Sequence, residues 1–216
     1  MKNMLLINFK TYKQGSSING LKIAKICDQL SKKYNKEILI AVQSMDIYKI
    51  SKSVKTKVLA QHIDPIEAGR NTGFIEANDV KKDGAYGTIL NHSEHKLKFN
   101  DLKKSFYYSK RAGLKVVICA ATPNEVKKVA RLKPDYIAIE PPELIAGKIS
   151  VSKANPNIIK NSVNSTRIPV LCGAGIKDAE DVRIALSLGA KGILVASGVL
   201  LSKNKKKSIE DIIKFL

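Results

Sequence analysis

The sequence predicts an α/β fold in which residues 1–216 form one (β/α)8 barrel domain. Short apolar runs alternate with longer stretches of helical periodicity along the whole chain, and no linker-like segment divides them. Eight runs are each followed by a helical stretch, as a closed parallel barrel requires. The length of 216 residues also lies within the range of single-domain α/β barrels.

The predicted strands are apolar runs that are rich in Ile, Val and Leu. Most of them do not alternate polar and apolar residues, which is typical of parallel strands covered on both faces. The strands are predicted at residues 4–9, 37–42, 57–61, 86–90, 115–119, 136–139, 169–172 and 192–195.

The first predicted helix, residues 17–34, has the clearest amphipathic pattern. Ile23, Cys27 and Leu30 fall on one face, whereas Lys32 lies largely away from it. The last helix is predicted to begin from Ser208, because serine is a favoured N-cap and acidic residues follow in the first turn. The other helices are predicted at residues 45–53, 100–112, 123–132, 157–164, 178–188 and 208–216, with a short helical turn at 78–83.

An open, doubly wound parallel sheet is the alternative fold. Such a sheet normally carries a glycine-rich loop after its first strand, where a nucleotide phosphate binds. Here the corresponding loop reads Lys10-Thr11-Tyr12-Lys13. The sequence therefore favours the closed barrel.

The chain is strongly basic, with 38 Lys and Arg residues against 19 acidic residues and a formal net charge of +19. Such a charge attracts anions, which include nucleic acids, anionic lipids and phosphorylated substrates. Most of the lysines lie at helical spacings or at helix ends, as in Lys205-Lys206-Lys207, and this is typical of a solvated surface. The charge alone therefore does not identify a partner.

The cysteines and the apolar segments indicate an ordinary intracellular protein. Cys27, Cys119 and Cys172 are scattered and have apolar neighbours, which predicts reduced thiols in place of disulfides or metal ligands. No apolar run is long enough to cross a bilayer, and the N-terminus carries no cleavable signal pattern. We therefore expect a cytoplasmic location.

In a (β/α)8 barrel, functional residues gather at the carboxyl ends of the strands. Asn8 and Lys10 follow the first strand and lie two residues apart, so both point to the same side of the chain. Lysine is a compact cation that can meet an anionic oxygen. His92 follows the fourth strand with Ser93 and Glu94 behind it, and a histidine here can donate a hydrogen bond or carry a proton. His62 and His95 are predicted to be structural.

Glu140 ends the sixth strand, and this position suits it to act as a general base. A carboxylate at the end of an apolar strand is partly desolvated, which raises its proton affinity. Pro141 and Pro142 follow and stiffen the chain ahead of a stretch with small residues, Ala146 and Gly147. This pattern predicts a lid with a rigid N-terminal hinge.

Two loops of small residues follow the last two strands and predict a phosphate site. They read Cys172-Gly173-Ala174-Gly175-Ile176 and Ala196-Ser197-Gly198. Small residues let backbone N–H groups approach an anion, and the loops after strands seven and eight bind phosphate in many barrels of this kind. Each of these features alone is commonly structural, but together they place a Lys, a His, a Glu and a phosphate cradle at one end of one barrel.

With these residues in place, the chain resembles the triosephosphate isomerase family, and in particular its short archaeal members. The likeness runs from the first strand to beyond the eighth, so it covers nearly the whole chain. The segments that carry it are Asn8-Phe9-Lys10, Asn91-His92-Ser93-Glu94, Ile139-Glu140-Pro141-Pro142-Glu143-Leu144-Ile145, Cys172-Gly173-Ala174-Gly175 and Ala196-Ser197-Gly198.

The resemblance implies that the chain interconverts dihydroxyacetone phosphate and D-glyceraldehyde 3-phosphate through an enediolate, without a cofactor or a metal. It implies that Glu140 abstracts the proton, that His92 polarises the carbonyl, and that Lys10 stabilises the negative charge. Asn8 would help to position the charge, and Glu94 would support the site from behind His92. The residues that it assigns to substrate binding are Asn8, Phe9, Lys10, Ile145, Gly175, Ala196 and Ser197.

The resemblance also implies a homodimer or a homotetramer, because residues 61–74 resemble the family's loop that docks into a neighbouring subunit, with Thr72-Gly73 at its tip. The chain departs from the family in its lid, where Ala146-Gly147-Lys148 stands in place of the usual Gly-Thr-Gly. A positive φ at Ala146 or Lys148 would be costly, so this departure bears on lid closure.

Two other functions remain as alternatives. Another phosphate-binding barrel enzyme would also use the last two loops, but it has no shared reason to keep Lys10, His92 and Glu140 together. A nucleic-acid-binding protein would suit the charge, yet it calls for exposed aromatic residues between basic ones, and aromatic residues make up only 6% of this chain with no Trp. We therefore do not expect nucleic-acid binding.

Overall fold

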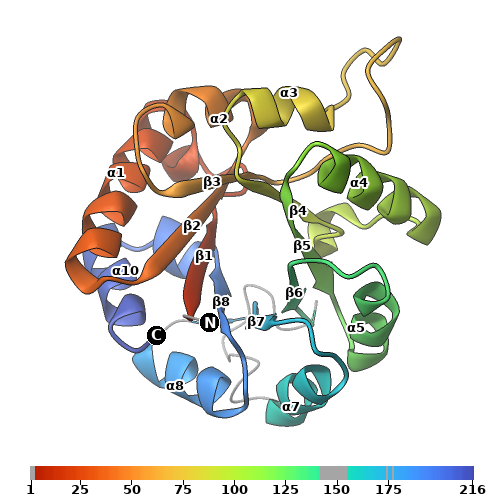
Figure 1. Cartoon of the computed structure of the whole chain (residues 1–216). Helices are drawn as coiled ribbons and strands as arrows, with labels where there is room; N and C mark the ends of the chain where they lie inside the picture. Colours follow the sequence, from red (N-terminus) through yellow and green to blue (C-terminus); the bar gives the residue numbers. More distant parts are fainter. Residues whose placement is uncertain (1–2, 142–154, 174, 177) are drawn as a thin grey trace.

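The computed structural model describes residues 3–141, 155–173, 175–176 and 178–216. Its eight strands form a closed parallel barrel in which each strand pairs with the next and β8 pairs with β1. Figure 1 looks into this barrel and shows the helices arranged around it. The strands are β1 (Met4–Asn8), β2 (Glu37–Val42), β3 (Lys57–Ala60), β4 (Gly87–Leu90), β5 (Lys115–Ala120), β6 (Tyr136–Ile139), β7 (Val170–Cys172) and β8 (Gly192–Val195).

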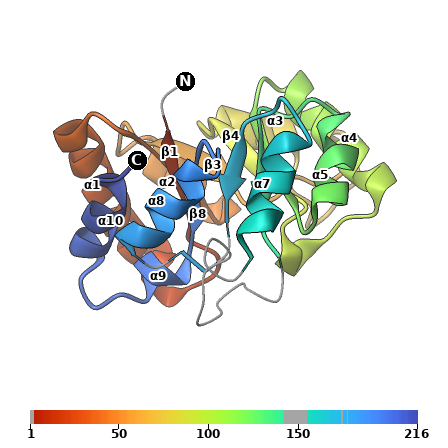
Figure 2. The same ribbon diagram turned by 90° about the horizontal axis from the view of Figure 1, so that it is seen from below.

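The helices lie outside the strands, as Figure 2 shows from the side. Two short 3-10 turns, η1 (Lys13–Gly15) and η2 (Ser93–His95), lie in the loops after β1 and β4. The described helices are α1 (Ser17–Tyr34), α2 (Ser44–Ser51), α3 (Ala77–Lys82), α4 (Phe99–Arg111), α5 (Pro123–Ala130), α7 (Pro156–Asn164), α8 (Ala179–Ser187), α9 (Ser197–Leu200) and α10 (Lys205–Ile213).

Both faces of the strands are buried, which explains why the predicted strands do not alternate polar and apolar residues. In β1, Met4 and Leu6 belong to a cluster that fills the barrel interior, whereas Leu5 and Ile7 pack outward against the helices. The interior cluster consists of Met4, Leu6, Leu39, Ala41, Leu59, Ile89, Val117, Cys119, Ala138, Leu171 and Leu194. The sheet is thus a packed core, and the functional groups are left to the strand ends.

The barrel closes between β1 and β8 at a position that only glycine fits. Met4 is paired with Gly192, and a Cβ on Gly192 would lie 2.4 Å from the carbonyl oxygen of Met4. The two strands can therefore approach closely only because this residue has no side chain.

The fold class and all eight predicted strands are confirmed, with boundaries that differ by one residue at most. The predicted start of the last helix is wrong. The helix α10 begins at Lys205, and the side chain of Asn204 caps it by accepting a hydrogen bond from the Lys207 N–H. Ser208 lies one turn inside the helix, where its hydroxyl donates to the Gly198 carbonyl oxygen at 2.8 Å and ties α10 to the first turn of α9.

The other sequence features fit this fold. Cys27, Cys119 and Cys172 are buried and form no disulfide bond with one another. Among the described residues, no helix has the length and apolar character needed to span a membrane.

Candidate active site

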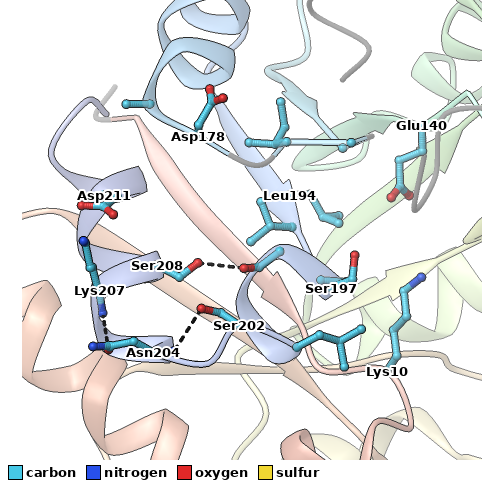
Figure 3. Close-up of a pocket in the computed structure, with 18 of the residues that line it drawn as sticks. Lys10, Glu140, Asp178, Leu194, Ser197, Ser202, Asn204, Lys207, Ser208 and Asp211 are labelled. Atoms are coloured by element: carbon cyan, nitrogen blue, oxygen red, sulfur yellow. Dashed lines mark hydrogen bonds between the residues drawn. The ribbon is translucent and has the colours of Figure 1, made fainter. Parts of the chain in front are cut away.

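Most of the predicted functional residues line two neighbouring cavities at the carboxyl ends of the strands. The larger cavity, of about 790 Å³, is lined by Lys10, His92 and Glu140 and by the loops that follow β7 and β8 (Figure 3). The second cavity, of about 540 Å³, shares Lys10 and His92 and extends to Asn8 and the loop after β3. Side chains from β1, β4 and β6 thus converge on one place, as the sequence predicted.

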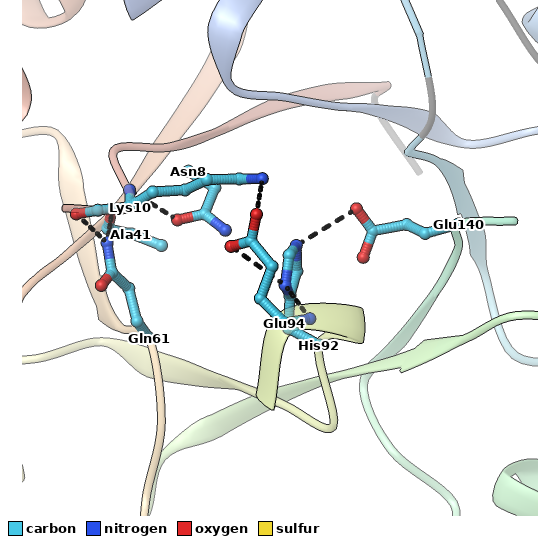
Figure 4. A network of polar contacts seen from close by, with 7 residues as sticks. All are labelled: Asn8, Lys10, Ala41, Gln61, His92, Glu94 and Glu140. Atoms are coloured by element: carbon cyan, nitrogen blue, oxygen red, sulfur yellow. Dashed lines mark hydrogen bonds and ion pairs between the residues drawn. The ribbon is translucent and has the colours of Figure 1, made fainter. Parts of the chain in front are cut away.

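Glu140 follows β6 directly and is nearly inaccessible to solvent, with 3% of its surface exposed. Its backbone N–H donates to the Ala120 carbonyl oxygen at 2.8 Å, which fixes the residue against the end of β5. Its Oε1 atom lies 3.6 Å from His92 Nε2, as Figure 4 shows, and the buried Oε2 atom has no hydrogen-bond partner within the described residues. A buried carboxylate with an oxygen to spare is well placed to accept a proton.

Two small neighbours shape the space around the Glu140 carboxylate. A Cβ on Gly173 would lie 2.5 Å from Glu140 Cγ, so the glycine after β7 leaves room for the side chain. The thiol of Cys119 in β5 lies against the same carboxylate, and burial together with the charge of Glu140 raises the pKa of this thiol well above its usual value. Gly173 was predicted only as part of the phosphate loop, and its contact with Glu140 was not predicted from the sequence.

The hydrogen bonding of His92 indicates a neutral imidazole. His92 is the N-cap of η2, and its Nδ1 atom accepts the N–H of Glu94 at 3.2 Å. An accepting Nδ1 carries no proton, so we assign the proton to Nε2, which faces Glu140. The tautomer that can donate a hydrogen bond toward the large cavity is therefore set by the backbone of η2.

The backbone of Lys10 has a left-handed conformation, with a φ of 47°, that is uncommon for a residue with a side chain. Its N–H donates to Asn8 Oδ1 at 3.0 Å, and its carbonyl oxygen accepts from Gln61 Nε2 at 3.0 Å. Gln61 also donates to the Ala41 carbonyl oxygen at 3.2 Å, so it joins the loop after β1 to β2. Gln61 was not predicted as a site residue, and nothing in the sequence distinguishes it from other polar residues at strand ends.

The ammonium group of Lys10 lies 2.6 Å from Glu94 Oε1 (Figure 4). Only 13% of the Lys10 side chain is exposed, whereas 56% of the Glu94 side chain is exposed. Glu94 therefore contacts both the cation and, through its backbone N–H, the ring of His92. The structure therefore places Glu94 beside both Lys10 and His92, whereas the resemblance implied only that it supports the site from behind His92.

The predicted phosphate loops line the large cavity through Gly175, Ala196 and Ser197. The N–H groups of Ser197 and Gly198 belong to the first turn of α9, so they have no partner within that helix. Ile145, Ala174 and the lid departure at Ala146-Gly147-Lys148 lie outside the described residues. No three His, Cys, Asp or Glu side chains in the described part of the chain are grouped so that they could hold a metal ion.

Phe9 differs from the other residues that were expected to contact substrate. Its side chain is fully buried among the residues between β1 and the helices, and it lines neither cavity. Phe9 lies between Asn8 and Lys10, so alternation along the extended chain directs its side chain away from theirs.

Comparisons with known proteins agree with the fold. The family model described as triosephosphate isomerase matches residues 3–216. Triosephosphate isomerase from Methanothermus fervidus is 42% identical over 215 residues, which is 97% of this chain and 97% of that protein. The one from Methanocaldococcus jannaschii is 43% identical over 218 residues, which is 99% and 100% of the two chains.

A solved structure supports the fold alone. The crystal structure of triosephosphate isomerase from Bartonella henselae superposes with a TM-score of 0.76 at 20% sequence identity. The alignment covers 100% of this chain and 99% of that chain.

Proposed function

Because this chain belongs to the triosephosphate isomerase family, we propose that Glu140, His92 and Lys10 are the groups that carry out the family's reaction in it. The chain is an isomerase that interconverts dihydroxyacetone phosphate and D-glyceraldehyde 3-phosphate, a reaction of glycolysis and gluconeogenesis. The observation that carries the proposal is the 3.6 Å separation of Glu140 Oε1 and His92 Nε2 in a cavity that Lys10 also lines.

In this proposal, Glu140 removes the carbon-bound proton next to the carbonyl group and later returns it to the neighbouring carbon. Its burial supports this role, as does its Oε2 atom, which has no hydrogen-bond partner among the residues that the structure describes. The electron pair of the broken C–H bond becomes the C–C double bond of the enediolate. The carbonyl oxygen gains the negative charge.

His92 and Lys10 act on the oxygen atoms of the substrate. The neutral imidazole donates its Nε2 proton to the carbonyl oxygen, where the charge develops, and moves protons between the two oxygens. The partner of Nδ1 supports this role, since the Glu94 N–H holds the ring in the donating tautomer. The Lys10 ammonium stabilises the charge of the enediolate and of the phosphate, while Asn8 and Gln61 hold its backbone.

We propose that the phosphate group binds to the small-residue loops after β7 and β8, through the backbone of Gly175, Ala196 and Ser197 and of Ile145 in the lid. The support is that the three described residues line the same cavity as Glu140 and His92, and that the first turn of α9 contributes N–H groups without helical partners. The substrate would then span the cavity, with its phosphate at β7 and β8 and its reacting carbons between Glu140 and His92.

We also propose that the chain forms a homodimer or a homotetramer in the cytoplasm. The segment between β3 and α3, which includes Thr72 and Gly73, projects from the barrel (Figure 1). Large apolar side chains are exposed at this segment and at the start of α2, namely Phe74 at 55%, Met45 at 91% and Tyr48 at 59%. Exposed apolar groups of this size are typical of subunit interfaces. The location follows from the glycolytic reaction.

A coupled assay of triose phosphate isomerisation with wild-type chain and Glu140→Asp tests the proposed base. The substitution keeps the carboxylate but withdraws it by one methylene, so we expect kcat to fall by about 100-fold with little change in KM. Circular dichroism spectra of both proteins control for folding. An unchanged kcat in Glu140→Asp would remove Glu140 from this role.

A further inference from the structure

Asn91, the residue before His92, is buried and has a left-handed backbone with a φ of 60°. Its side-chain amide makes three hydrogen bonds. Nδ2 donates to the Cys119 carbonyl oxygen at 2.9 Å and to Glu125 Oε1 at 3.0 Å, and Oδ1 accepts the Leu97 N–H at 3.0 Å. Because Leu97 follows the η2 turn, this one amide fixes both ends of the loop that carries His92.

The end of β5 connects Asn91 to the catalytic base as well. The Cys119 carbonyl oxygen accepts from the Asn91 amide, and the next carbonyl, that of Ala120, accepts the Glu140 N–H at 2.8 Å. The loop that carries His92 and the residue that removes the proton are therefore attached to adjacent carbonyl groups of one strand. The end of β5 thus supports both residues and sets the spacing between His92 Nε2 and Glu140 Oε1.

Glu125 anchors the Asn91 side chain. Its Oε1 atom accepts from Asn91 and from Lys96 Nζ, at 3.0 Å and 2.9 Å, and its Oε2 atom accepts the Ala121 N–H at 2.7 Å. Burial raises the pKa of Glu125, but the hydrogen bonds from the Ala121 N–H, Lys96 and Asn91 outweigh it and hold the pKa below its usual value. Glu125 is thus an ionised acceptor at neutral pH, and its hydrogen bond to Asn91 is charge-assisted.

We infer that Asn91 is a positioning residue for the isomerase reaction, which acts by holding His92 at its working distance from Glu140, with Glu125 as its anchor. Asn91 lines neither of the two cavities that Lys10 and His92 share, so it acts through His92 and not on the substrate. It lines a separate cavity of about 370 Å³ between α4 and α5. The inference rests on the proposed role of His92.

Asn91→Gly tests the inference, because glycine keeps the left-handed backbone and removes the buried side chain with its three hydrogen bonds. We expect kcat to fall by about 10-fold or more while KM changes by less than about threefold, since the base and electrophile are misplaced and the phosphate loops are not. The matched control is Asn35→Gly. Asn35 also has a left-handed backbone, with a φ of 48°, but it caps α1 ahead of β2, at the barrel end away from the site. We expect its kinetics to equal those of the wild type.

A pair of variants that moves the negative charge from position 125 to position 91 separates positioning from simple loss of stability. Asn91→Asp places a carboxylate against Glu125 and the Cys119 carbonyl oxygen, so we expect a larger loss of kcat than for Asn91→Gly. Adding Glu125→Gln supplies an amide that can donate to the new carboxylate, and we expect at least about threefold recovery of kcat.

A kcat for Asn91→Gly within twofold of wild type would overturn the inference, as would a rise in KM equal to the loss of kcat or an absence of recovery in the double variant. The wild-type chain and Glu140→Asp are assayed in the same series. An effect of Glu140→Asp without an effect of Asn91→Gly would sink the positioning role and leave the proposed function standing.

Discussion

At the scale of single residues, the site uses strained backbone beside its chemical groups. Lys10 and Asn91 both have positive φ values, of 47° and 60°, although neither is glycine. Each such residue costs about 1–3 kcal/mol, so its surroundings must hold it in place. Gln61 and Asn8 hold Lys10, and Glu125 holds Asn91. Positioning the lysine and the histidine therefore depends on the polar side chains around them.

Gly173 gives a prediction at this scale, because a Cβ there would lie 2.5 Å from Glu140 Cγ and 3.1 Å from Glu140 Oε1. The Glu140 side chain would have to swing away, while the backbone of Gly173 has no need to change. We expect Gly173→Ala to lower kcat by about 10- to 100-fold, because a displacement of about 1 Å moves the base off the reacting carbon. Steady-state kinetics check this result. If Gly173→Ala is as active as the wild type, catalysis does not depend on the present position of the Glu140 carboxylate.

Position along the strands made Lys10, His92 and Glu140 predictable from the sequence, since each follows the end of an apolar run. Gln61 and Glu125 were not predictable in this way. Gln61 holds the carbonyl group of a residue 51 positions away, and Glu125 accepts from a residue 34 positions away. Such pairs form only once the strands have closed into a barrel, so they cannot be predicted from the spacing of residues along the sequence.

At the scale of elements, strands were easier to place than helix ends. Burial on both faces requires continuous apolar runs. The ends of these runs agree with the ends of the observed strands to within one residue. The start of α10 was misplaced because Asn204 and Ser208 are both good N-cap residues one turn apart, and tertiary contact with Gly198 decides between them. The helix α9 has only four residues, too few to show helical periodicity.

Asp135 lies just before β6 and joins α4, β5 and β6, so its substitution tests how these elements are held together. It accepts hydrogen bonds from Lys110 Nζ at 2.7 Å, Lys115 Nζ at 2.8 Å and the Val116 N–H at 2.9 Å. Burial raises the pKa of Asp135, but these three donors outweigh it and lower the pKa below its usual value. We expect Asp135→Asn to reduce the free energy of unfolding by about 1–3 kcal/mol at pH 7, since charged hydrogen bonds are lost.

The pH dependence follows from that lowered pKa. The carboxylate stabilises the fold fully above its unfolded pKa, and this contribution is lost as the pH falls through the lower folded pKa. The difference between Asp135→Asn and wild type in thermal unfolding should therefore shrink as the pH is lowered from 7 toward 3. Asp79→Asn is the control, because its ion pair with Lys82 is exposed and contributes little. If the difference in thermal unfolding between Asp135→Asn and wild type stayed constant with pH, ionisation of Asp135 would not be the source of the stability.

At the scale of the whole molecule, the exposed apolar residues predict self-association. Met45 and Tyr48 lie three residues apart on α2, on one face of the helix, and Phe74 lies on the segment that projects from the barrel. The segment and the start of α2 line one cavity through Phe74, Gly73 and Ser44. The projecting segment and the start of α2 thus lie beside Lys10 and His92, and we expect a second subunit to cover this surface.

We expect sedimentation or light scattering to give a mass of at least two chains for the wild type, and Met45→Glu to shift the mass toward that of one chain. A charge buried in an apolar interface is costly, which is the reason for the shift. Leu201→Glu is the control, since Leu201 is exposed at 53% at the end of α9 and lines the large cavity, whose lining includes no residue of α2 or of the projecting segment. A monomeric wild-type chain at assay concentrations would refute the proposed oligomer.

The most direct test of proton abstraction by Glu140 follows deuterium from solvent into the substrate. Dihydroxyacetone phosphate is incubated in D2O with the wild-type chain or with Glu140→Gln, and NMR records C–H to C–D exchange at the reacting carbon. We predict that the wild type exchanges this hydrogen during turnover and that Glu140→Gln, which keeps the size of the side chain without its basicity, slows exchange by at least about 1,000-fold. If Glu140→Gln exchanged this hydrogen at the wild-type rate, that result would contradict proton abstraction by Glu140.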